Sequence, residues 1–199
     1  MSSHVVLYFA HAINCYNTPY ENAAVTLIRH AFPGADIENP NQPQHQEAYV
    51  AWRARSKDRD NHQGMDYFYD EVLPRCTGSI GMPFLDERFG LGVSGELQKT
   101  LKAGKPIWGM FLGRPATPSN MADWVQNPLN GFFQIRQFDP AQLEEIRNTN
   151  KEGSALVLGH QETRLRSWVV YNETQRPYET AHLVSLPIPV GFYADGPNR

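Results

Sequence analysis

Short apolar runs without polar alternation recur along the chain, separated by stretches with helical spacing. The first run, "HVVLYFA" at 4–10, is rich in β-branched and aromatic residues, which is typical of a strand buried on both faces of a parallel sheet. Further apolar runs predict strands at 35–39, 78–84, 105–112 and 131–138. The pattern therefore indicates a sheet of about five strands.

The stretches between these runs predict helices with recognisable ends. In the first, Thr18 is the expected N-cap, Pro19 fits the first helical position, Glu21 completes a capping box and Gly34 follows the end. An extended, proline-rich tail ends the chain. The other expected helices are 45–58, 62–73, 93–104, 139–153 and 160–173.

Strands that alternate with helices imply right-handed βαβ units and a parallel sheet with helices on both faces. Ligands of such folds bind beyond the carboxyl ends of the strands. Two segments in this position are unusually rich in polar and small residues: "HAINCYNT" (11–18) after the first strand and "LDERFGLGVSGE" (85–96) after the third. We therefore expect the functional site between these two loops.

Composition narrows the class of protein. The 199 residues fit one α/β domain, and a net charge of −3 provides no basic surface for a nucleic acid polymer. Cys15 and Cys76 are too few for a disulfide framework and suit a reducing cytoplasm as buried, free thiols. The apolar start is too short to span a membrane. These features lead us to expect a cytoplasmic protein. The seven histidines show no metal-ligand spacing, so we expect neither a metal nor another cofactor.

Three glycines precede a single carboxylate in the second loop. Gly90, Gly92 and Gly95 would permit positive φ angles and close backbone approach to a ligand just before Glu96. The amides of a following helix N-terminus would face an anion or a polar sugar. A purely structural strand–loop–helix turn would carry the same glycines, so the loop alone leaves both interpretations open.

The order of three segments is more specific. "YFAHAIN" (8–14), "HQGMD" (62–66) and "GLGVSGELQKTLKAGKPI" (90–107) resemble 2'-deoxynucleoside 5'-phosphate N-hydrolases of the nucleoside 2-deoxyribosyltransferase-like superfamily. The resemblance covers residues 1–115. It implies a flavodoxin-like (Rossmann-like) α/β fold, cleavage of the bond between a base and a sugar, and a homodimer or larger homo-oligomer.

The resemblance also implies roles for three side chains. Glu96 would be the nucleophile that attacks the anomeric carbon, Tyr8 would hydrogen-bond that carboxylate, and Asp66 would be the second acid. Asp70, one helical turn further on, competes with Asp66 for this role. These residue types suit N-glycosidic cleavage, because a carboxylate can trap an oxocarbenium-like centre while a second acid protonates the departing base.

The chain departs from the resembling enzymes in the residues that hold a phosphate. Two serines of the related hydrolases correspond to Ala12 and Gly90, and a sugar-binding aspartate of the transferases also falls on Gly90. His11, Asn14 and Arg88 offer replacement donors. The expected ligand-contacting positions are His11, Ala12, Ile13, Asn14, Arg88, Gly90, Gly92 and Val93.

Several functional alternatives remain open at this stage. The sequence distinguishes neither nucleoside from nucleotide nor hydrolysis from transfer to a second base. A TIR-like NAD-cleaving enzyme shares the βα order and also uses a glutamate that opens a helix after a short loop. A non-catalytic nucleotide-sensing module would account for the missing phosphate serines. A lysine-decarboxylase-like phosphoribohydrolase is a weaker alternative, because its Pro-Gly-Gly-x-Gly-Thr loop is absent.

Overall fold

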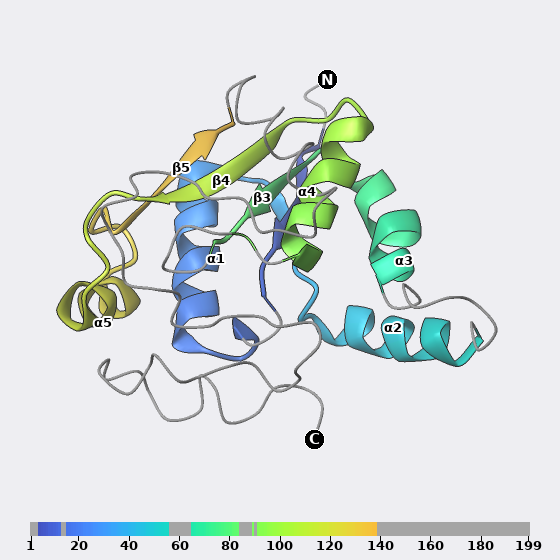
Figure 1. Cartoon of the computed structure of the whole chain (residues 1–199), viewed down its shortest axis with the longest axis horizontal. Coiled ribbons are helices and arrows are strands. Elements are labelled where there is room, and N and C mark those ends of the chain that lie inside the picture. The colour runs from blue at the N-terminus through green and yellow to red at the C-terminus, as the bar shows by residue number, and fades with distance from the viewer. Residues whose placement is uncertain (1–3, 13–14, 56–64, 84–88, 90, 139–199) are drawn as a thin grey trace.

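The computed structural model describes residues 4–12, 15–55, 65–83, 89 and 91–138 (Figure 1). The helices expected at 139–153 and 160–173 and the tail lie outside these residues. The described part confirms the expected α/β fold of the flavodoxin-like type, with one five-stranded sheet in the order β2-β1-β3-β4-β5. Its strands are β1 (Val6–Ala10), β2 (Asp36–Glu38), β3 (Gly78–Gly81), β4 (Ile107–Leu112) and β5 (Phe133–Gln137).

One edge of the sheet differs from the expectation. β2, β1, β3 and β4 are parallel neighbours, whereas β5 pairs antiparallel with β4. The Gly113 amide, just after β4, donates to the carbonyl of Phe132, just before β5, at 2.8 Å. After α5 the chain thus comes back to the end of β4 and not to its start. β5 therefore starts beside the end of β4 and runs back along it. Antiparallel edge strands are common on otherwise parallel sheets.

The first helix starts at its predicted N-cap, although Glu21 bonds the Asn17 amide and not the N-cap amide that a capping box uses. Thr18 is the N-cap of α1, its side chain accepts from the Glu21 amide, and Pro19 opens the helix. Gly34 and Gly104 have φ angles of 81° and 72° after α1 and α4, in agreement with the expected helix ends. The helices are α1 (Pro19–Ala31), α2 (Pro43–Arg55), α3 (Met65–Tyr67), the π-helix η2 (Phe68–Val72), the 3-10 helix η3 (Leu73–Arg75), α4 (Leu91–Lys102) and α5 (Pro118–Gln126).

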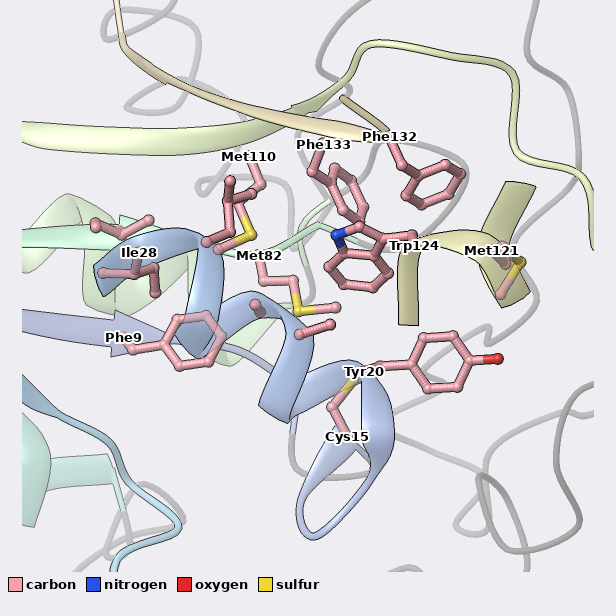
Figure 2. Packing of buried hydrophobic residues seen from close by; sticks show 14 of the residues in the cluster. Phe9, Cys15, Tyr20, Ile28, Met82, Met110, Met121, Trp124, Phe132 and Phe133 are labelled. Carbon is pink, nitrogen blue, oxygen red and sulfur yellow. The ribbon is translucent and has the colours of Figure 1, made fainter. Parts of the chain in front are cut away.

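Alternate residues of β1 divide the core into two layers. Leu7 and Phe9 face α1 and α5, whereas Tyr8 and Ala10 face η2 and α4. Figure 2 shows the first layer, in which Phe9, Ile28 and Met110 belong to one buried cluster. The expected helices on both faces of the sheet are therefore present.

Trp124 fills the α5 end of the first layer. Its indole is fully buried and meets Phe133 edge-on, with ring centroids 4.9 Å apart. The indole nitrogen has no hydrogen-bond partner among the described residues, and Figure 2 shows it on the side of the ring turned to Phe133. Both cysteines, Cys15 and Cys76, are buried and free, as expected.

None of the described helices combines the length and the apolar composition that crossing a membrane requires.

Candidate active site

Tyr8 and Glu96, which the resemblance pairs, are in direct contact. The Tyr8 hydroxyl, on the interior strand β1, donates a hydrogen bond to Glu96 Oε1 of α4 at 2.5 Å. The exposed fraction is 0% for Tyr8 and 5% for Glu96, so water does not compete for this bond. The pair joins residues 88 positions apart in the chain. This is the contact that the resemblance implies for the two residues.

Small residues on β3 let α4 approach the sheet closely enough for this contact. A Cβ on Gly81 would lie 2.8 Å from Leu97 of α4 and 2.9 Å from Phe89. Thr100 donates through its hydroxyl to the Glu96 carbonyl at 3.0 Å, and Ser79 lies 2.6 Å from the same hydroxyl. Because the single Thr100 proton is already used, Ser79 must be the donor to Thr100. These bonds fix the turn of α4 that carries Glu96.

Burial makes Glu96 a weaker acid than an ordinary glutamate. It raises the pKa of this carboxyl to about 8, and the Tyr8 hydrogen bond opposes the shift without cancelling it. Burial and the adjacent Glu96 also hold the pKa of Tyr8 well above its ordinary value, so Tyr8 remains a donor. Glu96 is therefore largely protonated at neutral pH. A strongly shifted carboxyl of this kind is typical of functional sites.

Asp66 lies on the same side of the sheet. Tyr69, one turn further along, has a pKa raised by burial and then by the charges of Glu96 and Asp66, so both carboxyls are within electrostatic reach of its hydroxyl. The competing Asp70 is exposed and lies 3.9 Å from Lys99. The geometry favours Asp66 over Asp70 as the second acid.

The glycines have a different role from the one expected. α4 begins at Leu91, so Gly92 and Gly95 lie inside the helix, and neither is among the residues with positive φ. The prediction of a left-handed turn at these two positions is therefore wrong, and Gly90 lies outside the described residues. A Cβ at Gly95 would lie 2.3 Å from the Tyr69 hydroxyl oxygen. Gly95 thus provides the space for Tyr69, not a bend in the backbone.

His11 is held by the protein itself. It is buried, its ring stacks on Phe9 at 4.2 Å, and its Nδ1 donates to the Phe9 carbonyl at 3.0 Å. Its Nε2 lies 3.3 Å from Glu21 Oε1, which is within ion-pair distance, although the angles do not meet hydrogen-bond geometry. The contacts with Phe9 and the nearby Glu21 carboxylate together fix the position of the ring. The geometry favours this structural role over the expected donation to a phosphate.

Glu21 organises the loops around the carboxyl ends of β1 and β2. Its carboxylate accepts from the Asn17 amide at 2.6 Å, one residue before the N-cap that a capping box would use. It also accepts from the side-chain amides of Asn39 at 2.7 Å and Asn41 at 2.9 Å. We call Glu21, His11, Asn17, Asn39 and Asn41 the Glu21 network. The roles of its asparagines were not predicted: Asn39 and Asn41 come shortly after β2, and Asn17 comes just before α1, but no local pattern links them to Glu21.

The Glu21 network lowers the pKa of its central carboxyl. Burial acts to raise this pKa, but the contacts with His11, Asn39 and Asn17 outweigh it, so the pKa of Glu21 falls below its ordinary 4.5. Tyr16 connects the Glu21 network with the Tyr8–Glu96 pair. Its ring centre lies 5.0 Å from that of His11. Its pKa is raised first by burial and then by the charges of Glu96 and Glu21. Two buried carboxyls with opposite shifts therefore flank Tyr16.

A second polar chain positions the helix that carries Asp66. His45 is 2% exposed and joins Glu38 Oε2, at 2.6 Å from its Nε2, to the Tyr67 hydroxyl, at 3.0 Å from its Nδ1. This chain links β2, α2 and α3, and Tyr67 directly follows Asp66. No local sequence pattern identifies this chain, because its three members come from separate elements.

The remaining predicted ligand contacts are described only in part. Ala12 is half-buried against one core layer, and Val93 is 4% exposed in the other, so the structure gives Val93 a packing role. Ile13, Asn14 and Arg88 lie outside the described residues.

Neither a metal centre nor a known relative identifies the chemistry. Among the residues that the structure describes, no group of three or more histidine, cysteine, aspartate or glutamate side chains is arranged to hold a metal ion. The resemblance to a known family rests on the order of the sequence motifs, and the Tyr8–Glu96 contact agrees with it. Comparison with protein-family models, with curated protein sequences and with solved structures finds no match to this chain.

Proposed function

We propose that this protein cleaves the N-glycosidic bond of a nucleoside or nucleoside 5'-monophosphate, with Glu96 as the nucleophile. The observation that carries the proposal is the buried Tyr8–Glu96 hydrogen bond at 2.5 Å. A hydroxyl that holds one carboxyl oxygen restricts the orientation of the whole group, which favours attack by the other oxygen on a bound sugar. The electrostatic proximity of Asp66 supplies the second acid.

The proposed reaction proceeds in two steps. A Glu96 oxygen bonds to the anomeric carbon as the carbon–nitrogen bond breaks, and the electron pair of that bond leaves with the base, which takes a proton from Asp66. Water then attacks the glycosyl-enzyme, gives its proton to Asp66 and releases the Glu96 carboxylate. A second base in place of water would make the protein a transferase. The homo-oligomer implied by the resemblance belongs to the same proposal.

This mechanism requires one proton shared by the two carboxyls. In the free protein that proton resides on Glu96, whose pKa is about 8, and it must reach the leaving base through Asp66. Base release should therefore decline as the pH rises through about 8, because the shared proton is lost.

Tyr8→Phe should change this pH profile in a defined direction. The Tyr8 hydrogen bond lowers the pKa of Glu96, so its loss raises that pKa and moves the alkaline limb of kcat/KM to higher pH. The ionised nucleophile becomes rarer, and the plateau should fall about tenfold for each pH unit by which the limb moves. Tyr20→Phe, in the opposite core layer, is the control. An alkaline limb that stays in place or moves to lower pH would contradict this role for Tyr8.

A chromatographic screen tests the function itself. The protein is incubated with common nucleosides, deoxynucleosides, their 5'-monophosphates and NAD, each with and without a second free base. We expect free base from at least one nucleoside or nucleotide, and a new nucleoside if transfer occurs. Nicotinamide release from NAD alone would favour the TIR-like alternative. Thermal stabilisation by a nucleotide without any released base would reject catalysis in favour of sensing.

A further inference from the structure

Tyr69 occupies an unusual turn of backbone beside Glu96. The segment Phe68–Val72 is a π-helix, and the Leu73 amide closes it by donating to the Phe68 carbonyl. Such wide turns are rare and occur frequently at functional sites. Tyr67 and Phe68 are buried in the core, whereas Tyr69 is only half-buried. Tyr69 thus lies at the margin of this core layer, packed against it but partly exposed.

The Tyr69 hydroxyl is seated against bare backbone. Its oxygen lies 2.3 Å from the place where a Cβ of Gly95 would be, so any other residue at position 95 would displace it. The position is inside α4, where glycine is unfavourable relative to alanine. The space for this hydroxyl therefore accounts for a glycine that the helix itself does not favour.

The ring is also fixed from the solvent side. Lys99 Nζ lies 5.5 Å from the centre of the Tyr69 ring, and the Asp70 carboxylate lies 3.9 Å from the same amine. A cation over the ring face stabilises this orientation. The hydroxyl is therefore held in place before any ligand arrives.

Within the described residues the Tyr69 hydroxyl has no hydrogen-bond partner, although it lies in the field of both Glu96 and Asp66. An ionised carboxyl repels a phosphate and a protonated one offers it only a single donor, so two carboxyls disfavour a phosphate at this point. They suit a neutral polyol, whose hydroxyl groups donate to carboxylates and accept from a phenol. We propose that Tyr69 is a substrate-binding residue that hydrogen-bonds a hydroxyl group of the pentose; this assignment rests on the proposed function.

Binding to a protein that cannot turn over tests this proposal. In a Glu96→Gln background, calorimetry measures the affinity for adenosine, guanosine, cytidine, uridine and their 5'-monophosphates, and then for the 2'-deoxy and 3'-deoxy forms of the tightest ligand. Adding Tyr69→Phe should weaken binding about three- to tenfold, the range of one neutral hydrogen bond. That loss should vanish for the deoxy analogue that lacks the bound hydroxyl.

Two further variants separate the hydroxyl from general effects. Gly95→Ala keeps Tyr69 but fills its seat, and should weaken binding to a similar extent while circular dichroism shows an intact fold. Tyr20→Phe removes a hydroxyl in the opposite core layer and should leave affinity unchanged. Unchanged affinity in Tyr69→Phe, or an equal loss for both deoxy analogues and the parent ligand, would overturn the proposal.

The results also distinguish this proposal from the proposed function. If the unaltered protein releases base while Tyr69→Phe binds normally, the glycosidase stands and the role of Tyr69 is rejected. If no base is released but Tyr69→Phe still weakens nucleoside binding, the role of Tyr69 stands and catalysis is rejected. If none of these ligands binds, both proposals are rejected.

Discussion

Glu96→Gln is expected to abolish base release and, at the same time, to make the folded chain more stable at alkaline pH. The amide cannot attack the anomeric carbon, so turnover should fall to the background of the assay. The same change removes a carboxyl that burial disfavours in its charged form, while leaving an oxygen that can accept from Tyr8. Loss of activity with a gain in stability is typical of a site selected for function.

The pH range of this stabilisation follows from the two pKa values of Glu96. The pKa is about 8 in the folded protein and 4.5 ordinarily, so the folded state retains a proton that the unfolded state releases. The favourable contribution is complete below pH 4.5 and is lost as the pH rises through about 8. Each pH unit in this window costs about 1.4 kcal/mol, so the total difference is on the order of several kcal/mol.

Denaturant unfolding at about pH 5, 7 and 9 measures this effect. The free energy of unfolding of Glu96→Gln should exceed that of the unaltered protein by an amount that grows with pH and levels off above about 8. Glu47→Gln, at an exposed position of α2, is the matched control and should show no such trend. A difference that is constant over the three pH values would mean that Glu96 is not held protonated by the fold.

Local signals were sufficient for much of the fold. The unbroken apolar run of β1 and the Thr18-Pro19 start of α1 depend on neighbouring residues alone, and both were predicted correctly. α5 was missed, although Thr117 and Pro118 form the same kind of start. The direction of β5 was not predictable from its own composition, because it is set by a tight return beside the end of β4.

The site residues also divide into those that sequence motifs predict and those that only the fold brings together. Glu96 and Tyr8 were paired through motif order, although no local pattern links residues on β1 and α4. The Glu21 network and Tyr69 were missed, because their partners depend on which strands and helices become neighbours. The glycines show the limit most clearly: Gly95 was expected to bend the backbone, whereas it makes room for the side chain of Tyr69.

Glu21 and Glu96 show how the environment alone assigns a charge state. Both are buried, but Glu96 receives one hydroxyl donor, whereas Glu21 receives a backbone amide, two side-chain amides and a histidine. The pKa of the first is therefore raised by burial, and that of the second is lowered despite it. Carboxyls whose environments separate their pKa values are what acid–base chemistry requires. At neutral pH this places a proton on Glu96 and a charge on Glu21.

Glu21→Ala should be among the most destabilising substitutions in the described part of the chain. It leaves the His11 ring and the side-chain amides of Asn39 and Asn41 without their shared acceptor. Removing one partner of a buried pair costs about 3–5 kcal/mol, and here the buried His11 ring loses the carboxylate beside its Nε2. Glu47→Ala, on the exposed side of α2, should change the free energy of unfolding by less than about 0.5 kcal/mol.

The pH dependence of the Glu21→Ala effect has the opposite sign to that of Glu96→Gln. Because the pKa of Glu21 is lowered in the folded state, its contribution is present above the ordinary value of 4.5 and is lost as the pH falls through the folded value. The gap between the unaltered protein and Glu21→Ala should therefore be widest near neutral pH and narrow in acid. Denaturant unfolding across the acid range measures this gap. If the gap keeps its width in acid, the packing of Glu21 and not its charge holds the two loops together.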